Sequence, residues 1–249
     1  MLALGAIALA GSVIYASTTL AFSGLGLIFL GALFLYIRPE KYTKNAILEA
    51  ALTPSFTTLN QMVRELGYKG DATYLPPRYF ANQENAKIYI SKHVDAPLPM
   101  PEVIQLYENQ AVARTAGGVL ITPPGIQLSR LLEKSLGKSF TKIDLENLQR
   151  NLPKLFVEDL EIAENLEIQT KDDTTKDVTI QTRIIKPFYT LEFKEAEEHS
   201  QTASSIGGPI CSAIAIAITK ATGKPLRIVG SRLSEDGNTL EAEYAIIEE

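Results

Sequence analysis

The sequence predicts an α+β protein, in which an N-terminal transmembrane helical hairpin precedes a soluble domain with an antiparallel sheet packed by helices. Three observations carry this prediction. The first 37 residues contain no Asp, Glu, Lys, Arg or His. Residues 166–185 and 226–247 each contain two alternating apolar segments around a polar turn. Between them, residues 207–222 are apolar nearly all round a helix, which is typical of a helix buried on every side. The C-terminal part is therefore expected to be a hairpin, a buried helix and a second hairpin.

The uncharged N-terminal stretch is long enough for two short membrane spans, since a bilayer core takes roughly 20 apolar residues in a helix. The polar run Ser17, Thr18 and Thr19 marks the break, with helices over 2–16 and 21–37. Three alternatives remain: one long tilted span, a buried soluble hairpin, and a cleaved signal peptide. The absence of a basic n-region speaks against the signal peptide, and an uncharged apolar run of this length is unusual in a soluble core.

Basic residues directly after the second predicted span set its orientation. Arg38, Lys41 and Lys44 follow this span, and Lys and Arg near a span end favour the cytoplasmic side. We therefore expect a cell-membrane protein with a two-span anchor over 1–37 and a cytoplasmic domain over 38–249, with a sub-boundary near residue 163. The lipid bilayer is the first expected partner.

Composition excludes several classes of function. All 24 Lys and Arg and all 29 Asp and Glu lie after Ile37, giving a net charge of −5. A mildly acidic domain lacks the basic face of a nucleic-acid binder, so no nucleic-acid partner is expected. A single Cys excludes an internal disulfide and a Cys-based zinc site, and the two His, His93 and His199, lie far apart. We expect no metal and no cofactor.

The first half of the domain alternates short helices and strands. A helix over 43–52 is followed by another that restarts at Thr53-Pro54, since Pro suits the first helical position. Proline cannot donate to a sheet ladder, so Pro76-Pro77 ends the first of two short strands, 72–75 and 86–90. A proline-rich loop follows over 96–101.

A third short strand, 117–122, leads through Pro123, Pro124 and Gly125 into a helix that ends at Gly137. A Gly-containing junction of this kind can bind phosphate through free backbone N–H groups. The two prolines remove two of those donors, and this favours a tight turn. A further helix over 144–160 is interrupted by Pro153.

The last third has the clearest periodicity. Strands over 166–170 and 178–185 flank a polar turn, and 188–193 is a further candidate strand. Strands over 226–231 and 239–247 are joined through Asp236-Gly237. One side of the last strand is apolar and the other largely acidic, so we expect a sheet covered on one side and wet on the other. Its apolar side carries Leu240, Ala242, Tyr244 and Ile246.

Two resemblances follow from these motifs. Four consecutive features resemble the end of 4-vinyl reductase-like domains, which are small-molecule-binding relatives of TRAPP subunits. They are the run 207–211 (Gly-Gly-Pro-Ile-Cys), the apolar helix, the run 222–224 (Thr-Gly-Lys) and the hairpin beginning at Arg227-Ile228-Val229. The second and third cysteines common near the final hairpin of that family are absent here. The whole chain, with its apolar hairpin and Asn151-Leu152-Pro153, also resembles uncharacterised archaeal membrane-anchored proteins. The first resemblance implies small-molecule binding, and neither implies an activity.

Cys211 and His199 are the candidate catalytic residues. Cys211 lies in the first turn of the buried helix, a position that favours the thiolate form, and His199 lies upstream of it. Together they would form a nucleophile and its base. The alternative is that Cys211 is a small core residue and His199 a surface one.

The Ser-, Thr- and Gly-rich loop before the same helix is the candidate ligand site. A helix N-terminus can bind an anion or a small ligand; the alternative is a simple connection with a capping serine. The preferred function is non-enzymatic: a membrane-anchored cytoplasmic domain that binds a small molecule or a membrane-protein partner, as a sensor or scaffold. The alternative is a membrane-anchored enzyme that uses Cys211 and His199. The candidate ligand-binding residues are Ser204, Ser205, Gly207, Gly208 and Cys211.

Overall fold

A computed structural model describes residues 2–36, 61–62, 65, 67–68, 70–94, 96–172, 178–187 and 206–248. The chain divides into two compact units, Met1–Leu48 and Glu49–Glu249, and each is described by itself. Several predictions lie outside the described residues: the basic flank at Arg38, Lys41 and Lys44, the helix over 43–52, most of the helix that follows Thr53, and the strand over 188–193.

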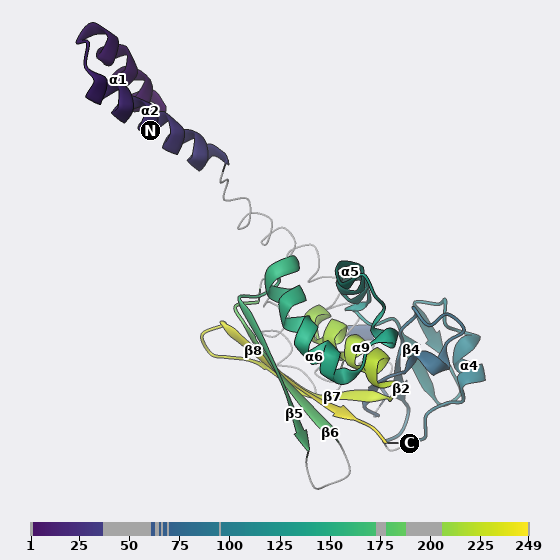
Figure 1. Cartoon of the computed structure of the whole chain (residues 1–249). Helices are drawn as coiled ribbons and strands as arrows, with labels where there is room; N and C mark the ends of the chain where they lie inside the picture. Colours follow the sequence, from purple (N-terminus) through teal and green to yellow (C-terminus); the bar gives the residue numbers. More distant parts are fainter. Residues whose placement is uncertain are drawn as a thin grey trace. The chain divides into compact units, whose positions relative to one another are not determined.

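The first unit contains two helices, as predicted: α1 (Leu2–Ile14) and α2 (Thr18–Tyr36) (Figure 1). The turn lies earlier than the predicted Ser17 to Thr19, because the Ser17 hydroxyl accepts a hydrogen bond from the Leu20 amide (3.5 Å) and so begins α2. Helix α1 correspondingly ends before Ala16. Among the residues that the structure describes, neither these helices nor any other is long and apolar enough to cross a membrane.

Close packing of α1 on α2 depends on glycines. A Cβ atom on Gly24 would lie 2.9 Å from the Leu9 amide nitrogen and 3.0 Å from the Gly5 carbonyl oxygen. A Cβ on Gly5 would meet the Ile28 side chain. By contrast, nothing lies within 4 Å of a Cβ built on Gly26. Glycines on one side of each helix thus let the two backbones approach, which is a property of small-residue helix contacts.

The second unit is α+β, as predicted, and holds an eight-stranded antiparallel sheet with the order β3-β4-β2-β1-β7-β8-β6-β5. The two predicted C-terminal hairpins are adjacent in it, because β8 pairs with both β7 and β6. Strand β3 was not predicted from the sequence. The strands are β1 (Ala72–Tyr74), β2 (Ile88–Ser91), β3 (Val112–Arg114), β4 (Gly118–Ile121), β5 (Asn165–Asp172), β6 (Val178–Ile185), β7 (Leu226–Leu233) and β8 (Thr239–Ile246).

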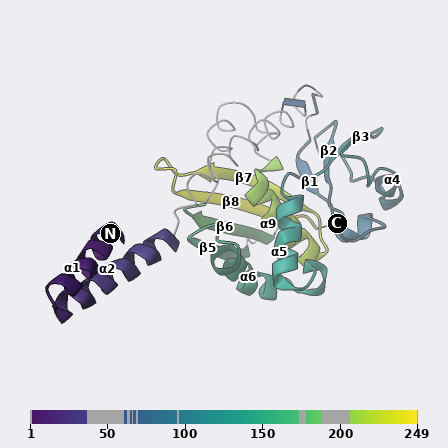
Figure 2. The same cartoon turned by 90° about the horizontal axis from the view of Figure 1, so that it is seen from above.

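Three helices cover one face of the sheet (Figures 1 and 2): α5 (Ile126–Leu136), α6 (Leu145–Lys154) and α9 (Pro209–Thr222). Helix α9 is buried from Ile210 to Lys220, as its all-round apolar pattern predicted, and Gly223 ends it in the left-handed conformation. Shorter elements among the described residues are α4 (Pro101–Gln105) and the 3₁₀ turns Pro77–Tyr79 and Phe140–Lys142.

Local sequence explains where these helices begin and end. The Asp144 carboxylate accepts a hydrogen bond from the Asn147 amide (2.8 Å) and caps α6. The predicted interruption at Pro153 takes the form of a π-helical turn, Leu155–Asp159, that follows α6 directly. The predicted tight turn before α5 is confirmed: Gly125 lies against the backbone of α9, and its amide donates to the Ser212 hydroxyl (3.0 Å).

Candidate functional site

The structure describes part of the ligand site predicted before α9. Gly208 is the N-cap residue of α9, Gly207 has a φ of +68°, and Cys211 follows in the first turn. A Cβ on Gly207 would lie 2.6 Å from the Ile228 side chain, so this glycine packs directly on the sheet. Ser204, Ser205 and His199 lie outside the described residues.

Cys211 is fully buried. Two buried tyrosines donate hydrogen bonds to backbone carbonyl groups at or near it. The Tyr244 hydroxyl donates to the Cys211 carbonyl oxygen (3.3 Å) and the Tyr74 hydroxyl to the Ile206 carbonyl oxygen (2.6 Å). Burial raises the pKa of both tyrosines above the usual value of 10.0. Both are therefore neutral donors that hold the start of α9 on the sheet. The pairing of Cys211 with His199 stays a prediction.

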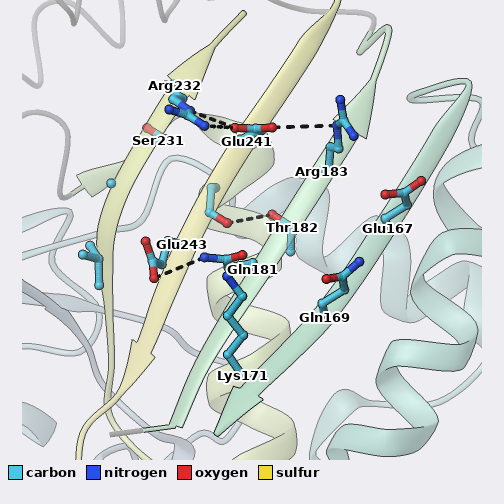
Figure 3. Close-up of a pocket in the computed structure, with 13 residues that line it drawn as sticks. Glu167, Gln169, Lys171, Gln181, Thr182, Arg183, Ser231, Arg232, Glu241 and Glu243 are labelled. Atoms are coloured by element: carbon cyan, nitrogen blue, oxygen red, sulfur yellow. Dashed lines mark hydrogen bonds and ion pairs between the residues drawn. The ribbon is translucent and has the colours of Figure 1, made fainter. Parts of the chain in front are cut away.

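A recess lies elsewhere, on the face of the sheet opposite the helices (Figure 3). It has a volume of about 720 Å³ and is formed by the four long strands β5, β6, β8 and β7. Most of its lining side chains are charged or carry an amide. We call it the concave polar face. The side chains used below are Glu167, Gln169, Lys171, Gln181, Arg183, Val229, Arg232, Glu241 and Glu243.

Strand register arranges the polar side chains of this face in rows. Glu167 lies opposite Arg183, Arg183 opposite Glu241, and Glu241 opposite Arg232. The Glu241 carboxylate is 2.6 Å from Arg232 Nη2 and 3.7 Å from Arg183 Nε. Acidic and basic groups therefore alternate across four strands, and the row has no net charge.

A second row, beside the first, carries amides. Gln169 lies opposite Gln181, and Gln181 lies opposite Glu243. Gln181 Nε2 donates to Glu243 Oε1 at 3.4 Å (Figure 3). The row offers both donors and acceptors to an incoming group.

A β-bulge in β7 shapes the recess. The register shifts between Ile228 and Gly230, so Val229 is the extra residue and its side chain is 58% exposed. A bulge bends its strand and increases the local twist, and Gly230 leaves open space where a Cβ would stand. The predicted wet face of the C-terminal hairpin is confirmed, but its concavity was not foreseen. A glycine inside a strand pattern is the signal that could have indicated it.

The concave polar face carries hydrogen-bonding and charged groups that could bind a ligand. The two guanidinium groups of this face, those of Arg183 and Arg232, both pair with the Glu241 carboxylate, and the Glu243 carboxylate accepts a hydrogen bond from Gln181. In the part of the chain that the structure describes, no group of three or more His, Cys, Asp or Glu side chains could hold a metal ion. The face therefore offers hydrogen bonds and balanced charge to a ligand.

A second unusual surface is on the helical hairpin. Large apolar side chains on both helices are exposed, including Ile14 at 77%, Phe22 at 76% and Phe29 at 68%. Exposed apolar surface of this extent marks a contact with lipid or protein. The other exposed apolar residues of the hairpin are Leu2, Leu4, Ile7, Val13, Tyr15, Leu20, Leu25, Leu30, Leu33 and Phe34.

These features define an α+β protein with an apolar helical hairpin and an eight-stranded antiparallel sheet. The chain belongs to the family DUF7982, described as a domain of unknown function, whose model matches residues 1–241. Because the match begins in the hairpin and ends in β8, it takes in both units. Comparisons with curated proteins and with solved structures give no match.

Proposed function

We propose that this protein is a membrane-anchored, non-enzymatic binding protein whose domain lies in the cytoplasm. The hairpin of α1 and α2 inserts into the lipid bilayer, and the concave polar face binds a ligand or partner. The observation that carries the anchor is the exposure of large apolar side chains around both helices of the hairpin.

Lipid insertion would remove an energetic cost that water imposes on this hairpin. Burying one large apolar side chain is worth about 1.5–3 kcal/mol, and side chains such as Leu25 and Phe29 are 60% and 68% exposed. The only buried residues of α1 are Gly5 and Ser12, so the two helices bury little apolar surface against each other. The basic run after α2 would hold the domain on the cytoplasmic side.

Charge substitution on the hairpin tests the anchor. Leu25→Lys/Phe29→Lys in the full chain places two lysines on one side of α2, each costing roughly 2.5–3.5 kcal/mol at the centre of a membrane-inserted helix. We expect the unaltered chain to stay in the membrane pellet after an alkaline carbonate wash and this variant to be released.

The matched control is Val94→Lys/Met100→Lys, because these side chains are 62% and 68% exposed in the second unit. The control is expected to stay in the pellet. Recovery of the unaltered chain in the soluble fraction after lysis would contradict the anchor.

Cysteine labelling tests the side of the membrane. Cys211 is the sole cysteine and is fully buried, so Asn109→Cys adds one reactive thiol at an exposed position. A membrane-impermeant maleimide is expected to label it only after the cells are opened. Labelling of intact cells would place the domain outside.

Balanced charge on the concave polar face favours a polar ligand without net charge. The row of Glu167, Arg183, Glu241 and Arg232 sums to zero, and Gln181 lies beside it. Free amino acids are suitable zwitterionic probes. A ligand that binds only the folded state raises its thermal stability. We expect at least one probe to raise the melting temperature of the full chain in detergent, and Gln181→Leu to abolish this shift.

The control for the ligand test is Gln127→Leu, an exposed glutamine on α5, which is expected to keep the shift. An equal shift in both variants would place binding elsewhere on the molecule.

A further inference from the structure

Strand β5 forms one edge of the sheet and is long for an edge strand. All eight of its residues, Asn165–Asp172, pair with β6 on one side. On its other side, no strand among the described residues pairs with it. The opposite edge strand, β3, has only three residues. Short edge strands resist pairing with another chain, whereas long ones present a row of backbone donors and acceptors to it.

We propose that β5 pairs antiparallel with β5 of a second copy of this chain, about a two-fold axis at Gln169, to form a continuous sheet. A two-fold interface brings the same surface of both copies together, and side chains alternate between faces along a strand. When the axis passes through a residue of β5, each residue of the concave polar face lies opposite another residue of that face, so the polar faces of both copies lie on the same side of the joined sheet. An axis between two residues would instead set each of them opposite a residue of the other face.

Charge complementarity selects the residue at the axis. With the axis at Gln169, Glu167 lies opposite Lys171 of the second copy, and symmetry repeats this pair. With the axis at Ile168, Glu167 would instead lie opposite Gln169 of the second copy. An axis at Glu167 would bring two carboxylates together, which is destabilising. Glu167, Gln169 and Lys171 are all exposed in one copy.

The rows of the concave polar face then continue into the second copy. Gln169 meets Gln169, so the amide row runs from Glu243 of one copy through Gln181 to the same residues of the other. Glutamine ladders add hydrogen bonds along paired strands. Two copies would therefore share one polar face twice as wide, open for the ligand of the proposed function. The dimer does not depend on the hairpin being in a membrane.

Disulfide trapping tests this register in the full chain, purified in mild detergent. Directly opposite residues have Cβ atoms about 5 Å apart, close to disulfide geometry. Gln169→Cys is therefore expected to form a covalent dimer under mild oxidation, with no background from the buried Cys211. Glu167→Cys alone would place its two thiols about 13 Å apart, so it should not cross-link. A mixture of Glu167→Cys and Lys171→Cys should.

Charge reversal tests the same pairs without a cross-link. Light scattering of the unaltered chain should give twice the 27.3 kDa mass of one copy. Glu167→Lys and Lys171→Glu should each raise the dimer dissociation constant roughly tenfold or more, because two attractive pairs become repulsive. The double variant Glu167→Lys/Lys171→Glu restores both pairs and should restore the dimer. Two results would overturn the proposal. One is a light-scattering mass of a single copy at every concentration of the unaltered chain, and the other is cross-linking of Glu167→Cys equal to that of Gln169→Cys.

Discussion

The two halves of the sheet differ in strand length and in what covers them. Strands β3, β4, β2 and β1 have three or four residues each, whereas β7, β8, β6 and β5 have eight each. In the short half, β1, β2 and β4 are buried along their whole length. In β6 and β8 of the long half, buried residues largely alternate with partly exposed ones. Among the described residues, the short half is therefore covered on both faces and the long half on one.

Apolar residues on the second face of the short half explain the difference. Ile88 and Ile90 face the main core beneath the helices, while Tyr89 between them belongs to a separate apolar cluster on the other side. The 3₁₀ turn Pro77–Tyr79 and helix α4 each contribute a residue to that cluster. The concave polar face accordingly lies on the long half, where the described residues form no second layer of this kind. The full cluster is Leu75, Tyr79, Phe80, Tyr89, Ile104, Ala113 and Leu120.

The largest expected effect contrasts a covered ion pair with an exposed one. Lys220 Nζ of α9 lies 2.9 Å from Glu133 Oε2 of α5, with side chains 3% and 13% exposed. Glu133 also accepts hydrogen bonds from Ser139 and the Phe140 amide. Glu133→Ala leaves a buried, unpaired lysine and should lower the free energy of unfolding by about 3–5 kcal/mol, measured by urea titration.

The matched control for this prediction is Glu241→Ala on the concave polar face. Glu241 pairs with Arg232, whose side chain is 77% exposed, and exposed pairs contribute only about 0.2–1 kcal/mol. Similar losses in the two variants would show that the long half is covered as well.

The next prediction concerns neighbouring residues within one strand. In β4, Leu120 and Ile121 are 0% and 1% exposed and belong to different apolar clusters. Leu120→Ala and Ile121→Ala should each lower the free energy of unfolding by about 2–5 kcal/mol. A small loss for Leu120→Ala alone would mean that the second apolar layer adds little to the free energy of unfolding. The two halves would then differ in burial but not in stability.

Lys87 gives a pH-dependent test within the short half. It is 3% exposed, and its ammonium group donates to the Thr122 hydroxyl (2.9 Å) and to the Gln110 carbonyl. Burial lowers the pKa of Lys87 below its usual 10.5, and the Glu108 carboxylate opposes this. Just below pH 10.5 the unfolded chain therefore binds more protons than the folded one.

The free energy of unfolding should consequently rise as the pH is raised toward 10.5 and lose this gain as the pH falls through the folded-state pKa of Lys87. Lys87→Met should remove that part of the slope, as measured by urea titrations across this pH range. Lys138→Met, at an exposed position between α5 and the 3₁₀ turn Phe140–Lys142, is the control. An unchanged slope in Lys87→Met would show that Lys87 is not held in a covered site.

Sequence periodicity predicted the long half better than the short half. The four long strands and α9 carry eight or more residues of consistent pattern, enough for periodicity to identify them. Strand β3 and α4 have three and five residues, too few for a period. An alternating pattern such as that of 86–90 is typical of a half-buried strand, but Lys87 and Tyr89 are buried along with Ile88 and Ile90, because the residues that cover them come from distant segments.

The concave polar face could be predicted only in part. Alternation in β8 indicated that Glu241 and Glu243 face water, and the structure confirms this face. Strands β8 and β6 are far apart in the sequence, and their pairing cannot be derived from local patterns. The row from Glu167 to Arg232 is therefore known only from the observed strand register. The lone cysteine indicated a site at the start of α9 instead, where Cys211 is buried.

The smallest expected effect gives the sharpest comparison, because it uses two adjacent residues of β6. Ile180 is 0% exposed, whereas Gln181 points to the concave polar face. Ile180→Ala should lower the free energy of unfolding by about 2–5 kcal/mol, and Gln181→Ala should change it by no more than about 0.5 kcal/mol. Both are measured by the same urea titration. In β4 both neighbours should matter and in β6 only one, since only β4 is covered on both faces. A large loss in Gln181→Ala would mean that another part of the chain packs on the concave polar face, and that this face is closed to ligands.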